Sequence, residues 1–312
     1  MGAPSDTGPA ALTWRLDLAW DGRGFVGWQR QRNGLSVQQV VEEALSRLLG
    51  HSEVRVRASG RTDAGVHALH QVTAFETAVQ REPARLKAGL NHLLPRSIAC
   101  LDVQPAPEGF DPRGWTTSKL YRYRILTRQA RCPFREGLCW HLARPPGQPL
   151  DVAAMQLAAQ RLVGRQDFRS FQARGCGAEH SVRLLQSVRL LEQPDELWLE
   201  FEGHGFLRHQ VRIMTGTLVE VGLGRRPESW VGEVVQARHR DAAGETAPAQ
   251  GLWLVEVRLG QGPRRPVDDG TPTGSGSAHP SSSDSSSPRS AGVASSSSSS
   301  SDGASSSSRS SL

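Results

Sequence analysis

The sequence predicts an α+β fold with two halves, residues 12–113 and 114–258, followed by a disordered tail at 261–312. Short segments with alternating apolar residues indicate half-buried strands, and apolar residues at helical spacing indicate amphipathic helices. The two kinds of segment follow the order β-α-β-β-α-β in the first half and repeat it loosely in the second. This order is ferredoxin-like. We therefore expect mainly antiparallel sheets with helices on one side, and a cleft between the halves.

Local signals place each element of the first half. Its predicted elements are a strand at 12–20, a helix at 36–50, strands at 54–58 and 71–75, a helix at 85–94 and a strand at 98–103. Apolar and polar residues alternate in 12–20, as in a half-buried strand. Ser36, with Gln39 three residues later, is typical of a capping box, and Gly50 ends that helix. Pro95 stops the second helix.

The second half is predicted in the same way. Its elements are a strand at 121–125, a helix at 151–164, strands at 187–191 and 197–201, a helix at 207–221, a helix from 227 and a strand at 252–257. Asp151 caps the first helix, and a Gln-Pro-Asp turn joins the two middle strands. The stretch at 105–114 contains proline and glycine and is the expected junction between the halves.

Composition limits the classes of partner. The tail from about 261 is mostly Ser, Gly, Pro and Asp, so it buries too little apolar surface to fold. Its four arginines and four aspartates cancel, so the net charge of +6 belongs to the folded part. A basic body suits a polyanion, although ordinary solubility charge explains +6 equally well. Arginine outnumbers lysine greatly, which suits phosphate binding but is also expected from an arginine-rich genome.

Several classes of protein and site are not expected. The four cysteines show no C-x-x-C spacing and no paired histidines accompany them, which favours reduced thiols over a zinc site. No apolar run approaches the roughly 20 residues of a membrane helix. The first residues resemble neither a secretory signal nor a transit peptide. We expect a cytoplasmic protein without a metal or a membrane span.

One loop contains the candidate chemistry. Residues 59–67 read SGRTDAGVH, so two glycines frame Arg61 and Asp63 directly after a predicted strand. Glycine permits a tight turn that presents a side chain into a cleft. From spacing alone, an ordinary surface turn is the more frequent explanation.

Four segments, in order along both halves, resemble the TruA family of tRNA pseudouridine synthases. They are DGRGFVGWQRQ at 21–31, GRTDAGVHA at 60–68, SKLYRYRI at 118–125 and GFLRHQVRIMTG at 205–216. The stretch NHLLP at 91–95 fits as well. Trp20 stands where the family commonly has tyrosine, residues 172–180 are variable ground, and the tail has no family counterpart. Four ordered motifs are far more specific than one.

The resemblance implies a role for each candidate residue. Asp63 is the catalytic nucleophile, which breaks the glycosidic bond by adding to the uracil ring or by chemistry at the ribose. Arg212 pairs with that carboxylate and keeps it charged. Tyr121 stacks on the target uracil. Arg61 helps the nucleotide leave its stack or contacts its phosphate, although a structural contact to a neighbouring loop is the alternative. No cofactor is implied.

The flanking aromatic and basic residues have simpler alternatives. Tyr121 and Tyr123 share one strand face and are both candidates for the core, and we expect only Tyr123 to pack deeply. Three arginines near Trp28 (Arg23, Arg30 and Arg32) suit an RNA backbone, whereas Trp28 itself is expected to be buried.

The sequence thus predicts an isomerase that converts uridine to pseudouridine at positions 38 to 40 of the tRNA anticodon stem-loop. The resemblance also implies a homodimer. Two other classes stay open: a non-catalytic RNA-binding protein, and a nucleoside hydrolase. The hydrolase needs a second acid beside Asp63, and none accompanies it in these motifs.

Overall fold

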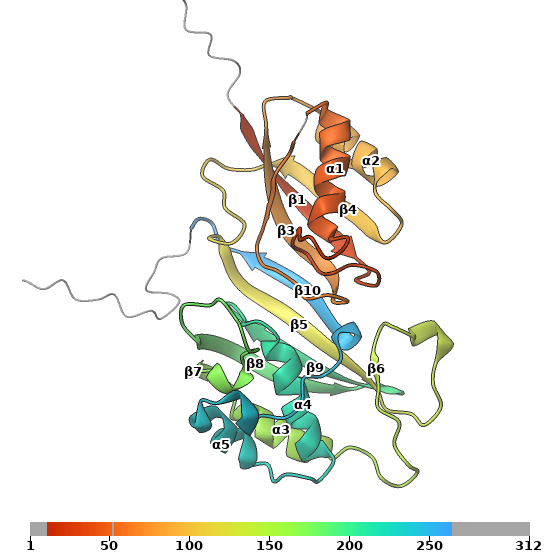
Figure 1. Ribbon diagram of the computed structural model, residues 1–312, viewed down its shortest axis with the longest axis vertical. Coiled ribbons are helices and arrows are strands. Elements are labelled where there is room, and N and C mark those ends of the chain that lie inside the picture. The colour runs from red at the N-terminus through yellow and green to blue at the C-terminus, as the bar shows by residue number, and fades with distance from the viewer. Residues whose placement is uncertain (1–10, 52, 264–312) are drawn as a thin grey trace, which may run out of the picture. The chain divides into compact units, whose positions relative to one another are not determined.

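The computed structural model describes residues 11–51 and 53–263, so the predicted tail lies outside the described residues from position 264 onward. Within the described part, the strands form one sheet in the order β4-β1-β3-β10-β5-β9-β8-β7, with β2 beside β3 and β6 beside β5 (Figure 1). Most neighbouring strands are antiparallel. The expectation of an α+β protein with a mainly antiparallel sheet is confirmed.

The first half has the predicted element order. Its elements are β1 (Leu12–Trp20), α1 (Val37–Leu49), β2 (Val56–Ala58), β3 (His67–Thr77), α2 (Pro83–Leu93) and β4 (Ile98–Pro105). The Ser36 hydroxyl accepts a hydrogen bond from the Gln39 amide at 3.2 Å, and Gly50 ends α1 with a left-handed φ of 72°. The Gln39 side chain bonds Glu43 instead of the backbone, so only half of the predicted capping box forms.

The second half repeats this arrangement with additions. Its strands are β5 (Thr116–Leu126), β6 (Trp140–His141), β7 (Gly164–Asp167), β8 (Val182–Glu192), β9 (Glu196–Gly203) and β10 (Leu252–Leu259). Its helices are α3 (Val152–Gln160), α4 (Gln210–Gly222) and α5 (Trp230–Ala237). The short strands β6 and β7 were not predicted. The Asp151 carboxylate caps α3 by accepting from the Ala154 amide at 2.9 Å.

The expectation of a separate sheet in each half is wrong, because a single sheet runs through both halves. Strand β10 pairs antiparallel with β5 and parallel with β3, where Trp253 and Leu254 lie opposite His67 and Ala68. The reason lies in the length of β3. It begins at His67 instead of 71, and β2 covers its edge only at residues 73–75. The uncovered backbone groups near His67 need partners, and β10 supplies them.

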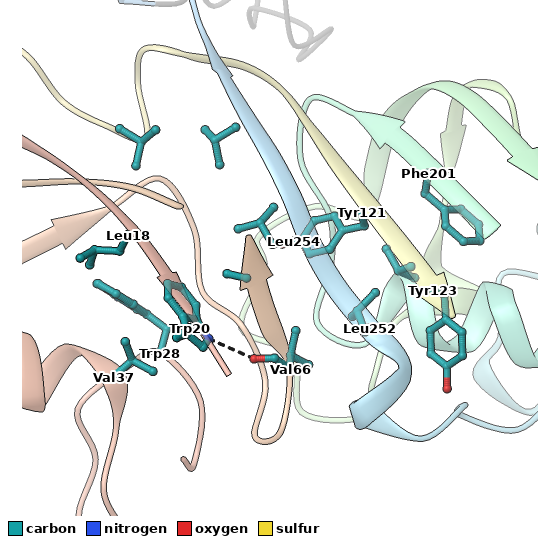
Figure 2. Close-up of a cluster of buried hydrophobic side chains, with 14 of the residues drawn as sticks. Leu18, Trp20, Trp28, Val37, Val66, Tyr121, Tyr123, Phe201, Leu252 and Leu254 are labelled. Carbon is teal, nitrogen blue, oxygen red and sulfur yellow. Dashed lines mark hydrogen bonds between the residues drawn. The ribbon is translucent and has the colours of Figure 1, made fainter. Parts of the chain in front are cut away.

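The core continues across this junction. Leu252 and Leu254 of β10 lie between the tyrosines of β5 and the cluster around Trp20 and Trp28 (Figure 2). The Trp20 indole donates a hydrogen bond to the Val66 carbonyl at 3.1 Å. Continuous packing fixes the loop before β3 relative to the second half of the chain.

Two further findings concern the whole described region. None of its helices is both long enough and apolar enough to cross a bilayer. The cysteines at 100, 132, 139 and 176 are free thiols.

Candidate active site

The loop at 59–66 connects β2 to β3 and is fixed mainly through its backbone. The Ser59 amide donates to the Val72 carbonyl at 2.9 Å, and the Val66 amide donates to the Asp63 carbonyl at 3.2 Å. The Lys119 ammonium of β5 donates to the Ser59 carbonyl at 2.6 Å. The Asp63 side chain is therefore presented from a closed turn that residues of both halves hold in place.

A second loop, the N-terminal motif at 21–31, lies against the first. The Trp28 amide donates to the Thr62 carbonyl at 3.2 Å, and the Gly65 amide donates to the Phe25 carbonyl at 3.3 Å. Gly27 has a φ of 106°, and a Cβ atom there would lie 2.5 Å from the Thr62 oxygen. This close approach explains why the motif needs glycine at that position.

In the N-terminal motif, Trp28 supports the loop from the core while the three nearby arginines are exposed. Trp28 is buried, as expected, and packs on Trp20 with ring centroids 5.5 Å apart. Arg23 pairs with Asp21, and Arg30 pairs with Glu42 and Glu43. Arg32 is exposed.

The Asp63 carboxylate meets two side chains from the second half. Its Oδ2 atom lies 3.6 Å from Nη1 of Arg212 and 3.6 Å from Nε2 of His209. The side chains of Asp63 and His209 are each 25% exposed, and that of Arg212 is 14% exposed. The site is thus partly closed but open to a ligand. The expected meeting of Asp63 and Arg212 is confirmed by this geometry.

Helix α4 and the segment beyond it position Arg212. Its Nε atom donates to the Ala247 carbonyl at 2.7 Å, and the Ala247 amide donates to the Arg212 carbonyl at 3.1 Å. The segment can approach this closely because Gly216 has no side chain: a Cβ atom there would lie 1.9 Å from the Glu245 oxygen. The Nε edge of the guanidinium is therefore held by the Ala247 backbone, while its Nη1 atom faces the Asp63 carboxylate.

His209 is the site residue to which the sequence assigned no role. It precedes α4 with a left-handed φ of 62°, which is uncommon for a residue other than glycine. The helix consequently begins at Gln210 instead of the predicted 207. In the sequence, His209 and Arg212 stand three residues apart within the predicted helix at 207–221, and this helical spacing was the only signal that pointed to His209.

The protonation of His209 follows from its surroundings. Burial lowers the pKa of the imidazole below its usual 6.5, Asp63 opposes this shift, and the nearby Arg212 and Arg208 add to it. At neutral pH the ring is accordingly neutral. It therefore contributes a hydrogen-bonding group beside Asp63 without a second positive charge.

Both tyrosines of β5 are buried, so the expectation that only Tyr123 packs deeply is not confirmed. Tyr123 is fully buried and its hydroxyl donates to the Pro248 carbonyl at 2.7 Å. Tyr121 is 8% exposed and meets Phe206 edge to face, with ring centroids 5.0 Å apart. Burial, and then the charge of Asp63, raises the pKa of the Tyr121 phenol. Tyr121 is thus protonated and within electrostatic reach of Asp63.

Arg61 lies on the open side of the loop. Its side chain is exposed and has no hydrogen bond or ion pair with any residue in 11–51 or 53–263. The alternative role of Arg61, a structural contact to a neighbouring loop, is therefore not seen among these residues.

The site can perform nucleophilic and electrostatic chemistry. It combines a carboxylate, a guanidinium directed at it, a neutral imidazole and a buried phenol. A carboxylate that is oriented by a fixed cation can attack an electrophilic carbon. No three His, Cys, Asp or Glu side chains in the described region are gathered so that they could hold a metal ion.

Comparisons with known proteins identify relatives of the chain. The family model described as tRNA pseudouridine synthase matches residues 19–113 and 158–259, which include Asp63 and Arg212 but not Tyr121. A tRNA pseudouridine synthase A from Myxococcus xanthus is 46% identical over 82% of this chain and 96% of the relative. A tRNA pseudouridine synthase A from Acidiphilium cryptum is 47% identical over 78% of this chain and 95% of the relative. One from Syntrophotalea carbinolica is 46% identical over 78% of this chain and 94% of the relative.

Proposed function

Because the chain belongs to the tRNA pseudouridine synthase family, and is thus an isomerase, we propose that it converts uridine to pseudouridine at positions 38 to 40 of the tRNA anticodon stem-loop. Asp63 is the nucleophile in this proposal and no cofactor takes part. The observation that supports it most strongly is the meeting of the Asp63 carboxylate with Arg212 at 3.6 Å. Two far-apart motifs of the sequence converge at that contact.

The proposed reaction is balanced without another reactant. The Asp63 carboxylate forms a bond either to the uracil ring or to the ribose, and the bond between the base nitrogen and the ribose breaks. The base rotates and a carbon–carbon bond forms through C5. The C5 proton leaves, the ring nitrogen freed from the ribose takes up a proton, and the carboxylate is released. A carboxylate suits these steps because it can form and release a covalent bond at neutral pH.

The neighbouring residues have separate roles. Arg212 orients the Asp63 carboxylate and lies within 3.6 Å of it. Tyr121 stacks on the uracil after the nucleotide has left its helix, and its slight exposure suits a site for one flipped base. Arg61, exposed beside Asp63, helps the nucleotide leave its stack or contacts its phosphate.

Three more general expectations belong to the proposal. The residues 12–113 and 114–258 form two domains, supported by the repeated strand order. The protein is a homodimer on tRNA, as the family resemblance implies. It is cytoplasmic, with which four free thiols agree.

The hydrolase alternative is less well supported by the site. A glycosidase-like reaction requires a second carboxyl group near the first. Among the described residues, the groups that face the Asp63 carboxylate are the guanidinium of Arg212 and the neutral imidazole of His209, and neither is a carboxyl group.

Tritium release tests the proposal directly. The wild-type protein is incubated with tRNA that contains 5-tritiated uridine, and pseudouridine is then mapped by chemical modification. We expect release of tritium and pseudouridine at positions 38 to 40. Absence of release would favour the RNA-binding alternative, and release of free uracil the hydrolase. Pseudouridine at other positions would overturn the assigned site but keep the enzyme.

A further inference from the structure

A hollow adjoins the candidate active site on the side of the second half. Its volume is about 360 Å³, and the polar side chains that line it are Arg174, Arg208, His209, Arg240, Asp241 and Thr246. They come from three segments: the variable stretch after β7, the turn before α4 and the region after α5. None of these arginines has a part in the mechanism above.

The charges around this hollow are not balanced. Three arginines face one carboxylate, and Asp241 already pairs with Arg174 at 2.7 Å. Arg240 donates to the Ala243 carbonyl at 3.3 Å and to the Thr246 hydroxyl at 3.1 Å, both of which are neutral. Among the described residues, neither Arg208 nor Arg240 forms an ion pair.

A partly buried guanidinium is costly, and burial lowers the pKa of Arg240 although the charge of Asp241 opposes this shift. An anion in the hollow would remove that cost. Two guanidinium groups present planar sets of N–H donors that match the oxygens of a phosphate. The hollow therefore has the charge and the donors of a phosphate site.

His209 connects this hollow to the reaction. The imidazole lines the hollow and also lies 3.6 Å from the Asp63 carboxylate. The His209 ring thus lies between the Asp63 carboxylate and the hollow that Arg208 and Arg240 line. A phosphate in the hollow would belong to a nucleotide directly adjacent to the one at Asp63.

We propose that this hollow binds a backbone phosphate next to the target uridine, through Arg208 and Arg240. This inference rests on the proposed function, because it requires an RNA substrate at Asp63. Binding the flanking phosphate would hold the backbone while the target base turns, since phosphate contacts fix register and orientation without reading sequence. Arg174 neutralises Asp241, which would otherwise repel the phosphate.

The test combines a protein change with an RNA change. Arg208→Gln removes one guanidinium that is exposed and has no ion pair with a described residue, so the fold is expected to stay intact. The RNA is an anticodon stem-loop with a single neutral methylphosphonate, placed 5′ or 3′ of the target uridine in separate molecules. Arg85→Gln is the matched control, because Arg85 on α2 is also exposed and is not paired within the described residues.

The measured quantity is the dissociation constant for each protein with each RNA at fixed ionic strength. We expect Arg208→Gln, and one of the two methylphosphonates with the wild type, each to weaken binding by about tenfold, as for one charge-assisted hydrogen bond. Combining the two should cause no further loss, because both remove the same contact. For the control, the fold-change in the dissociation constant caused by Arg85→Gln and that caused by the methylphosphonate should multiply, because the two changes affect separate contacts. A multiplicative result for Arg208→Gln at both positions would overturn the proposal.

Two controls separate the possible failures. If inorganic phosphate binds the wild type but not Arg208→Gln, while neither methylphosphonate matters, the hollow binds free phosphate and the RNA contact is wrong. If the wild type forms pseudouridine although the two effects multiply, the phosphate site fails and the enzyme stands. If no pseudouridine forms at all, the proposed function fails as well.

Discussion

Each half of the sheet contains a hairpin whose connecting loop includes an aspartate, and the two hairpins are equivalent in position. In the first half, β2 and β3 are joined by the loop with Asp63, and in the second, β8 and β9 are joined by a short turn with Asp195. Each hairpin lies at the same position in its half, with β3 beside β1 and β9 beside β5. Each aspartate also has an arginine nearby, at 3.6 Å for Arg212 and 3.5 Å for Arg128.

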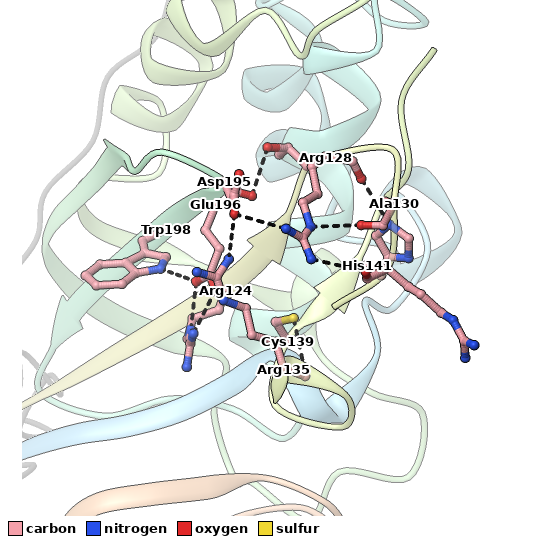
Figure 3. Close-up of polar contacts among 11 residues, drawn as sticks. Arg124, Arg128, Ala130, Arg135, Cys139, His141, Asp195, Glu196 and Trp198 are labelled. Carbon is pink, nitrogen blue, oxygen red and sulfur yellow. Dashed lines mark hydrogen bonds and ion pairs between the residues drawn. The ribbon is translucent and has the colours of Figure 1, made fainter. Parts of the chain in front are cut away.

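The surroundings of the two pairs differ. The Asp195 and Arg128 side chains are 37% and 36% exposed, and Arg128 also donates to the Ala130 carbonyl at 2.9 Å (Figure 3). Arg135 reaches both Asp195 and the buried Glu196, which binds Arg124 as well. In this network three arginines pair with two carboxylates.

At Asp63 the partners instead leave room for a ligand. Arg212 is more buried than Arg128, His209 is neutral, and a hollow with unpaired arginines adjoins them. An aspartate–arginine distance alone therefore does not distinguish a site from a structural contact. The difference arises from the long loop on one hairpin and from α4 packing opposite it.

Substituting the arginine beside each aspartate should separate the two sites strongly, because only one of the two substitutions is expected to slow the reaction. Arg212→Gln removes the cation that holds Asp63 and should lower the rate of pseudouridine formation by about 10² to 10³-fold. Arg128→Gln is a close control, since both arginines donate through Nε to a backbone carbonyl and through Nη1 approach an aspartate. Single-turnover rates with saturating enzyme measure both. Equal losses would mean that the two pairs are not functionally different.

The network around Asp195 should matter for stability instead. Burial raises the pKa of Glu196, but the hydrogen bonds from Arg124 and the indole of Trp198 outweigh it, so the net pKa is lowered. Glu196→Gln should cost about 2 to 3 kcal/mol in the free energy of unfolding, because a buried charge loses its partner. Denaturant unfolding measures this cost. The rate at a temperature where the variant is folded should be nearly unchanged, and a selective loss of activity would contradict the assignment.

The smallest expected effect concerns pH. The folded pKa of His209 lies below its usual 6.5, so the unfolded chain takes up a proton at higher pH than the folded chain. The contribution of neutral His209 to stability is complete above about pH 6.5 and is lost as the pH falls through the folded pKa. His209→Gln should reduce the acid loss of stability by roughly 1 kcal/mol or less.

Local patterns were enough to predict most elements of the fold. Apolar alternation and helix caps such as Ser36 and Asp151 depend on neighbours in the sequence, and the structure has them. The pairing of β10 with β3 could not be predicted in this way, because it depends on the backbone that β2 leaves uncovered. The expectation of separate sheets failed for that reason.

The candidate site was predicted only in part, and through the family resemblance. Asp63, Tyr121 and Arg212 lie in motifs that the resemblance marks, and the structure places them near one another. His209 was missed because its left-handed backbone and its approach to Asp63 are tertiary features. The hollow was missed for the same reason, as its lining comes from three distant segments.

The most direct test of the central claim compares the two aspartates themselves. Asp63→Asn and Asp195→Asn each remove one charge without changing side-chain size, and single-turnover formation of pseudouridine is measured for both. The account predicts a loss of at least about 10³-fold for Asp63→Asn, with stem-loop binding retained, and a change of no more than about threefold for Asp195→Asn. A rate near that of the wild type for Asp63→Asn, or an equal loss in the two variants, would contradict it.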